Sequence, residues 1–125
     1  MSRATQQRTA IWACLEAALG PLLPEEVLAQ AQRECATLGQ ATVYRTLAAL
    51  EAEGDVARVV AADGRARFER TRGHHHHFAC RSCDRVFDVE GCRSSAASLS
   101  RGLPDGFVLE GHDVWLRGLC AECGT

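Results

Sequence analysis

Residues 40–69 read QATVYRTLAALEAEGDVARVVAADGRARFE, and this stretch decides the fold. Its first half predicts a helix over 40–53 that ends at Gly54. We expect one face of this helix to be buried, because apolar residues recur at helical spacing at Val43, Leu47 and Leu50. The opposite face is then exposed and carries Ala41, Tyr44, Arg45 and Ala48. An exposed Tyr-Arg pair between small residues is unusual for a face that only meets solvent.

The second half of the stretch predicts a β-hairpin. Residues 56–60 and 66–69 are short runs typical of strands, and Asp63-Gly64 between them is a strong turn signal. Two further helices are expected upstream, over 6–19 and 24–35, from their apolar spacing and, in the second, from a proline at the first position. Three helices followed by a hairpin form the plan of a winged helix-turn-helix domain.

The sequence changes character after Gly73. Strands are expected over 78–80, 85–89 and 107–116, and a weak helix over 93–101. We place the domain boundary near 71–73. The predicted fold class is α+β, with an N-terminal winged helix-turn-helix over 1–72 and a small C-terminal α/β domain over 73–125.

Composition limits the classes of function. The 125 residues carry a formal net charge of −2, and all 14 cations are arginine, so a strongly basic chain is excluded although local basic patches are not. The sequence shows neither a long apolar run nor a signal peptide, and we expect a cytoplasmic protein without membrane contact.

Four of the seven cysteines form two Cys-x-x-Cys pairs, Cys80/Cys83 and Cys120/Cys123. Four thiolates in two short turns suit a closed, tetrahedral structural Zn²⁺ site. A redox dithiol and an accidental pair are the alternatives. Zinc would fasten the C-terminal tail beside the strand region 78–89 and contribute directly to folding.

Four histidines, His74 to His77, precede the first cysteine pair. If the segment is extended, His75 and His77 point to one side while His74 and His76 point to the other, so one tract can serve two metal sites. A purification tag would be terminal and longer.

Four motifs together resemble the ferric uptake regulator family of metal-sensing repressors, over essentially the whole chain. They are Arg3-x-Thr5-x-x-Arg8, the segment ATVYRTL at 41–47 with Leu50 and Gly54, the block HHHHFxCxxC at 74–83, and GLCxxC at 118–123. The resemblance, most marked to zinc uptake regulators, implies a homodimer with an N-terminal winged-helix DNA-binding domain and a C-terminal dimerisation domain. Metal loading then closes the dimer onto an AT-rich inverted repeat.

The resemblance implies that helix 40–53 reads the major groove of operator DNA. Tyr44 is then expected to pack on a thymine methyl group and Arg45 to reach a guanine edge or a phosphate. Three further residues are expected to contact phosphate or the minor groove: Arg8, Thr42 and Arg65. Packing is the alternative for Thr42, and Thr46 has the same two alternatives of phosphate contact and packing. Arg67 is a weaker candidate because strand alternation turns it aside. A solvated surface is the alternative for each of these residues.

For the sensory metal site the resemblance implies Glu69, His75 and His77. Iron and peroxide sensors of the family add a histidine early in the second helix, and residues 21–24 contain none. This difference disfavours iron and peroxide sensing. Asp55 is a nearby acid, but its alignment with the family's acid is not secure.

A second family site joins His74 and His76 to a histidine in the last strand, here His112, and to an acid that falls by count at Ser95. Serine cannot supply that carboxylate, which leaves two possible substitutes, Glu90 and Cys92, or an incomplete site. A free thiol is the alternative for Cys92. A thiolate ligand would favour zinc over manganese or iron.

We therefore expect a metal-dependent repressor, not an enzyme, that holds structural Zn²⁺ and senses a second divalent metal, with zinc preferred. The expected partners are double-stranded operator DNA and a second copy of the chain, with no small organic substrate. A regulator of the response to iron, manganese, nickel or peroxide is the alternative within the family. A zinc-dependent hydrolase lacks a His-Glu-x-x-His motif here, and a structural zinc-ribbon module would leave Tyr44 and Arg45 unexplained.

Overall fold

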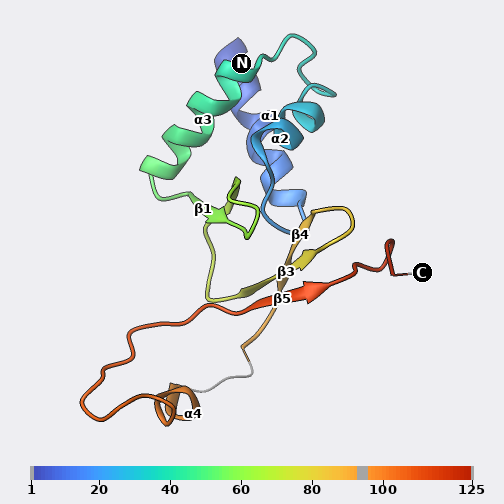
Figure 1. Cartoon of the computed structure of the whole chain (residues 1–125). Helices are drawn as coiled ribbons and strands as arrows, with labels where there is room; N and C mark the ends of the chain where they lie inside the picture. The colour runs from blue at the N-terminus through green and yellow to red at the C-terminus, as the bar shows by residue number, and fades with distance from the viewer. Residues whose placement is uncertain (1, 93–95, 125) are drawn as a thin grey trace. The chain divides into compact units, whose positions relative to one another are not determined.

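The computed structural model of the chain describes residues 2–92 and 96–124 (Figure 1). The chain forms two compact units, Met1–Arg72 and Gly73–Thr125. Within the described ranges no helix is both long enough and apolar enough to cross a bilayer.

The first unit contains the three helices and the hairpin that the sequence predicts: α1 (Arg3–Ala17), α2 (Pro24–Ala31), α3 (Gln40–Ala52), β1 (Val56–Val60) and β2 (Ala66–Arg70). Helix α1 begins earlier than predicted because the side chain of Ser2 caps it, accepting a hydrogen bond from the amide of Thr5 at 3.1 Å. Helix α2 is shorter than predicted. Its last turn tightens into i→i−3 hydrogen bonds, such as that from the Glu34 amide to the Ala31 carbonyl.

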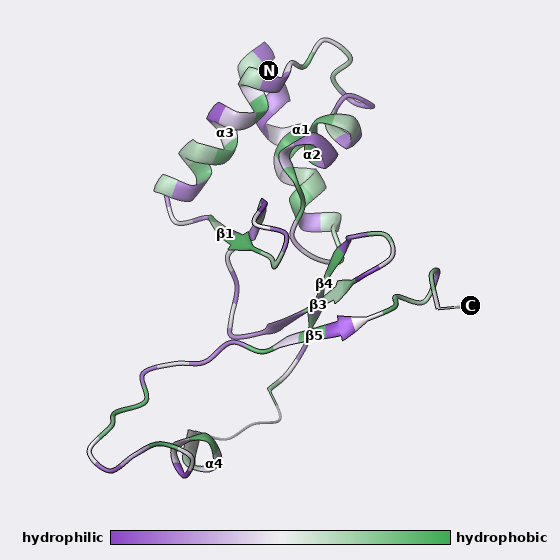
Figure 2. Ribbon diagram, viewed as in Figure 1, coloured by the Kyte–Doolittle hydropathy of each residue, from purple (hydrophilic) through white to green (hydrophobic). Residues whose placement is uncertain are grey.

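The core of the first unit comes from one face of each helix and from the hairpin. Its buried apolar residues include Ile11, Leu15, Val27, Val43, Leu47, Leu50, Val56 and Phe68. Figure 2 shows α3 with alternating hydrophobic and hydrophilic positions along its length. Because Val43, Leu47 and Leu50 face the core, Tyr44 (48 % exposed) and Arg45 face outward as predicted.

The turn between β1 and β2 is organised by Asp63. Its carboxylate accepts the amide of Arg65 at 3.0 Å and two hydrogen bonds from the guanidinium of Arg67 at 3.1 and 2.9 Å. Gly64 has φ +77°, which a residue with a side chain rarely adopts. Arg67 is only 1 % exposed, so its guanidinium is buried against Asp63 and does not lie on the outer surface.

Replacing Asp63 with asparagine should therefore destabilise the first unit by about 2 kcal/mol, somewhat below the usual cost of breaking a fully buried pair because Asp63 itself is partly solvated. The hydrogen bond from Arg67 lowers the pKa of Asp63. A carboxyl of lowered pKa stabilises the fold above its unfolded-state pKa of about 4 and loses this contribution as the pH falls through its folded-state pKa. Urea denaturation should show the full difference from wild type at pH 7 and a smaller difference at pH 3, and Asp105→Asn serves as an exposed control.

The second unit is a three-stranded sheet with a short helix: β3 (His76–Cys80), β4 (Val86–Val89), α4 (Ala96–Ser100) and β5 (Trp115–Gly118). The strand order is β4-β3-β5, with β3 antiparallel to β4 and parallel to β5. The predicted helix over 93–101 is present from Ala96, and residues 93–95 lie outside the described residues.

The predicted strand over 107–116 is wrong for most of its length, because β5 begins only at Trp115. Phe107 and Val108 are apolar but 64 % and 82 % exposed. A strand requires a neighbouring backbone for its hydrogen bonds, and a run of apolar residues does not show whether such a backbone lies beside it.

Candidate metal centres and DNA-binding face

The four cysteines of the two Cys-x-x-Cys pairs come together in the second unit, with their sulfur atoms within 4.8 Å of one another. Parallel pairing of β3 with β5 sets Cys80 opposite Gly118, so the chain after β5 brings Cys120 and Cys123 to the end of β3. The first turn closes with a hydrogen bond from the Asp84 amide to the Cys80 carbonyl and a positive φ of 62° at Asp84.

The surroundings of this cysteine quartet (Cys80, Cys83, Cys120, Cys123) favour thiolates at Cys80 and Cys120. Although a hydrogen bond with Ser82 lowers the pKa of Cys123, hydrogen bonds with the other cysteines and burial outweigh it and raise this pKa to about 12. Cys80 and Cys120 are buried. Hydrogen bonds from the backbone amides of Cys83 and Cys120 lower the pKa of Cys80 to about 6, and the amide of Cys123 lowers the pKa of Cys120. Four clustered sulfur donors, two of them with lowered pKa values, fit a closed tetrahedral Zn²⁺ site.

A second group of potential ligands, which we call the His-Cys cluster, consists of His74, His76, Cys92 and His112, with ligand atoms within 4.8 Å of one another. The Nε2 atom of His112 lies 3.3 Å from Nε2 of His74 and 3.1 Å from Sγ of Cys92. Of the two substitutes considered for the missing acid, Cys92 belongs to this cluster and Glu90 does not. Ser95, where the acid falls by count, lies outside the described residues.

His76 is the most buried member of the His-Cys cluster, at 6 % exposed. Its Nδ1 atom accepts a hydrogen bond from the Val114 amide at 3.1 Å, whereas its Nε2 atom is buried and has no hydrogen-bond partner among the described residues. Burial lowers the pKa of His76, and charge on His74 and His112 lowers it further. The imidazole is thus neutral at pH 7, with its single ring proton on Nε2, because Nδ1 accepts from the Val114 amide. A metal ion at this nitrogen would have to displace that proton, so metal binding here would release a proton.

A third group forms on the other side of the histidine tract, from His75, His77 and Asp88. The Oδ1 atom of Asp88 lies 3.3 Å from Nε2 of His75 and 3.5 Å from Nε2 of His77. Nδ1 of His75 is 2.9 Å from the Gly73 carbonyl, a contact that places the ring proton on Nδ1 and leaves Nε2 for a metal. The ring of Trp115 lies against that of His77 at 5.1 Å between centroids.

Asp88 is a candidate ligand that the sequence analysis missed. It lies opposite His77 in the antiparallel pairing of β3 with β4. A correct prediction of that register would have placed Asp88 beside the histidine tract. Glu69, the acid expected to join His75 and His77, belongs to the first unit, where it is buried in β2.

Of the expected DNA contacts of α3, Tyr44 and Arg45 are exposed and Thr42 is half-buried. A terminal nitrogen of Arg45 donates to Oγ1 of Thr42 at 3.1 Å, which orients the guanidinium along the helix surface. Thr46 is half-buried, in keeping with a packing role.

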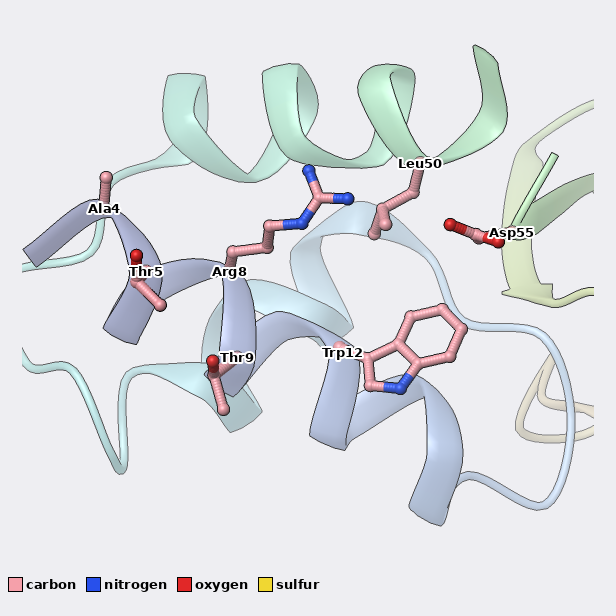
Figure 3. A pocket seen from close by; sticks show the side chains of 7 residues that line it. All are labelled: Ala4, Thr5, Arg8, Thr9, Trp12, Leu50 and Asp55. Atoms are coloured by element: carbon pink, nitrogen blue, oxygen red, sulfur yellow. The ribbon is translucent and has the colours of Figure 1, made fainter. Parts of the chain in front are cut away.

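The two other arginines expected at DNA are each paired with a carboxylate. Arg65 makes an ion pair with Glu25, and Arg8 donates to Glu53 at 2.6 Å. Figure 3 shows Arg8 reaching from α1 toward α3, in a pocket of about 640 Å³ that also contains Trp12 and Asp55. Arg8 therefore ties the first helix to the end of α3.

Comparisons with known proteins identify the family of the chain. The family model described as the ferric uptake regulator family matches residues 1–117. The "Ferric uptake regulation protein" of Bordetella parapertussis is 35% identical over 103 residues, which cover 82% of this chain and 74% of that protein. The "Transcriptional regulator FurA" of Mycobacterium tuberculosis is 38% identical over 82 residues, 65% of this chain and 56% of that protein, so the chain matches about half of FurA.

Solved structures share the fold. A "zinc-bound manganese uptake regulator" has 30% sequence identity and a TM-score of 0.81, over 95% of this chain and 91% of that one. FurB from M. tuberculosis, described as a zinc uptake regulator, has 30% identity and a TM-score of 0.54, over 97% of this chain and 95% of that one.

A winged helix domain and several clusters of metal ligands in one chain define the class of metal-responsive DNA-binding regulators. The chain belongs to the ferric uptake regulator family, whose members are transcriptional regulators with an N-terminal DNA-binding domain and a C-terminal dimerisation domain. Members of this family are not enzymes, which excludes a hydrolase, and they bind DNA, which excludes a zinc-ribbon module without DNA binding.

Proposed function

We propose that this protein is a zinc-responsive repressor that binds an AT-rich inverted-repeat operator as a homodimer when it is loaded with zinc. The observation that carries the choice of metal is the His-Cys cluster, which we assign as a second regulatory site that must be filled together with the sensory site. Three imidazoles and one thiolate are donors that suit Zn²⁺, whereas Mn²⁺ prefers oxygen ligands. The absence of a histidine at residues 21–24 supports the same choice.

In this proposal the metal groups have separate roles. The cysteine quartet holds structural zinc, and the His-Cys cluster holds a further zinc ion. His75, His77 and Asp88 form the sensory site together with Glu69. Because Glu69 and the histidines belong to different domains, a metal held by all of them would select one relative orientation of the domains, and operator DNA would select the same one.

The proposed DNA interface consists of α3 and positively charged side chains around it. Tyr44 and Arg45 read bases in the major groove, while Arg8, Thr42 and Arg65 contact the backbone or the minor groove. The ion pairs of Arg8 and Arg65 must yield to phosphate. Exposed ion pairs contribute only about 0–1 kcal/mol each, so this exchange is not costly.

A second copy of the chain is the proposed partner of the C-terminal domain. Strand β5 stands at the edge of the sheet in the order β4-β3-β5. Apolar side chains are exposed on this strand and in the chain just after it, at Leu116 and Leu119, and in the segment that leads to it, at Phe107 and Val108. An edge strand with exposed apolar residues is suited to pairing with another chain.

The proposal is tested by a mobility-shift titration of the purified protein on an AT-rich inverted-repeat DNA. Zn²⁺, Mn²⁺ and Fe²⁺ are compared at buffered free concentrations on protein that keeps its structural zinc. A weak chelator that leaves this zinc in place provides the state without regulatory metal. Binding is expected in the chelator only at high protein concentration, and zinc should restore it at the lowest free concentration. Equal binding with and without metal would contradict the proposal.

Replacing Cys92 with serine should lower the affinity of the His-Cys cluster for zinc by at least about tenfold, since even changes outside the ligand shell cost about 10–100-fold. Affinity for Mn²⁺ should change less, because it gains little from a thiolate. Competition with a chromogenic chelator measures both constants. Cys35→Ser removes a thiol from the first unit and should leave both unchanged.

A further inference from the structure

The guanidinium of Arg85 lies against two members of the cysteine quartet. Its Nε atom donates to Sγ of Cys83 at 3.3 Å, and a terminal nitrogen donates to Sγ of Cys120 at 3.6 Å. These sulfur atoms come from different Cys-x-x-Cys turns and are 3.9 Å apart. One side chain thus donates hydrogen bonds to both halves of the quartet.

Other contacts hold Arg85 in this position. A terminal nitrogen also donates to the carboxylate of Glu122 at 2.9 Å, and the guanidinium lies over the ring of Phe87 at 5.2 Å. The backbone of Arg85 is fixed as well, because its carbonyl accepts the amide of Cys80 at 3.0 Å. The planar fork of arginine can reach two sulfurs and a carboxylate at once, which the point charge of lysine cannot reproduce.

The two sulfurs differ in their access to solvent. Cys83 is exposed, whereas Cys120 is buried. An oxidant from solution therefore meets Cys83 first. Hydrogen bonds donated to a metal-bound thiolate withdraw charge from the sulfur, and a less basic sulfur is a weaker nucleophile.

We propose that Arg85 is a positioning residue that protects the cysteine quartet from oxidation by peroxides, so that the site remains structural. The inference rests on the proposed structural zinc. It assigns to this side chain a role in the chemical resistance of the site, separate from sensing and from DNA binding.

The reaction that Arg85 opposes has two steps. The Cys83 sulfur attacks one oxygen of the peroxide; an S–O bond forms, the O–O bond breaks and hydroxide leaves, which gives a sulfenic acid. The neighbouring Cys120 thiolate attacks that sulfur; an S–S bond forms, the S–O bond breaks and a second hydroxide leaves. Two electrons pass from the sulfurs to the peroxide, and the disulfide removes two of the four zinc ligands.

The test measures zinc release from the full-length, zinc-loaded protein. Excess hydrogen peroxide is added with the chromogenic chelator 4-(2-pyridylazo)resorcinol, and the rate of absorbance change is compared among variants. Arg85→Ala should release zinc about tenfold faster than wild type, because the sulfur becomes more basic without its hydrogen bonds and a more basic thiolate is a stronger nucleophile. Arg85→Lys keeps the charge without the fork and should fall between the two.

The matched control is Arg81→Ala, which removes an exposed arginine from the turn between Cys80 and Cys83. Its release rate should equal that of wild type. In Arg85→Ala, peptide mapping should find that a Cys83–Cys120 disulfide accumulates first. The thermal unfolding of Arg85→Ala without peroxide should equal that of wild type.

Two results would overturn the proposal: release from Arg85→Ala within twofold of wild type, or equal acceleration by Arg81→Ala. If Arg85→Ala cannot be isolated with zinc, Arg85→Lys decides, and a rate equal to wild type counts against the inference. Metal analysis distinguishes failure of the proposed zinc site from failure of the proposed role of Arg85. Wild-type protein that binds no zinc at the quartet contradicts the structural site itself, whereas full zinc with no effect at Arg85 contradicts only the protective role.

Discussion

Replacing Arg45 with alanine is expected to reduce operator affinity by roughly 30-fold to 10⁴-fold, because a dimer presents the side chain twice and each bidentate base contact contributes about 1–3 kcal/mol. The exposed position of Arg45 on α3 and its hydrogen bond to Thr42 support this role. Zinc content and dimer formation should not change, since the side chain touches neither the core nor the metal clusters. Fluorescence anisotropy with labelled operator at fixed salt measures the loss.

The control for this prediction is Arg33→Ala, which removes an exposed arginine just after α2. It carries the same change of charge but lies off the proposed reading face, so its effect should be a few-fold at most. Binding by Arg45→Ala within a few-fold of wild type would rule out α3 as the reading helix in the proposed form.

The first unit could be predicted from sequence because its signals are local. Helical spacing of Val43, Leu47 and Leu50 fixes which face of α3 is buried, and therefore which face carries Tyr44 and Arg45. The hairpin follows from Asp63-Gly64, where the glycine takes the positive φ and the aspartate holds the next residues. Each of these features depends on residues within one or two turns of chain.

The features that sequence analysis missed depend on non-local pairing. Asp88 joins His75 and His77 only because β4 returns antiparallel to β3 in one particular register. The partners of Arg8 and Arg65 are 45 and 40 residues away along the chain. The strand predicted over 107–116 failed for the same reason, since a strand exists only where another backbone lies beside it.

Few of the described side chains are buried in the second unit, so its stability depends on the proposed zinc. Loss of this zinc is therefore the second change for which we expect a large effect. Among the described residues of this unit the buried side chains are Cys80, Val86, Cys120 and His76, whereas the first unit has a continuous apolar core. Two of these four are members of the cysteine quartet.

Replacing Cys120 with serine should therefore abolish structural zinc binding and unfold the second unit, because structural zinc supplies about 10–16 kcal/mol in small zinc-dependent folds. The first unit should keep its helices, since its core contains no proposed ligand of the quartet. Circular dichroism should show a partial loss of structure and light scattering a loss of dimer, and a strong chelator should reproduce both in wild type. Cys35→Ser should retain zinc and dimer. A Cys120→Ser protein that remains a folded dimer without zinc would show that the quartet does not hold this half of the molecule together.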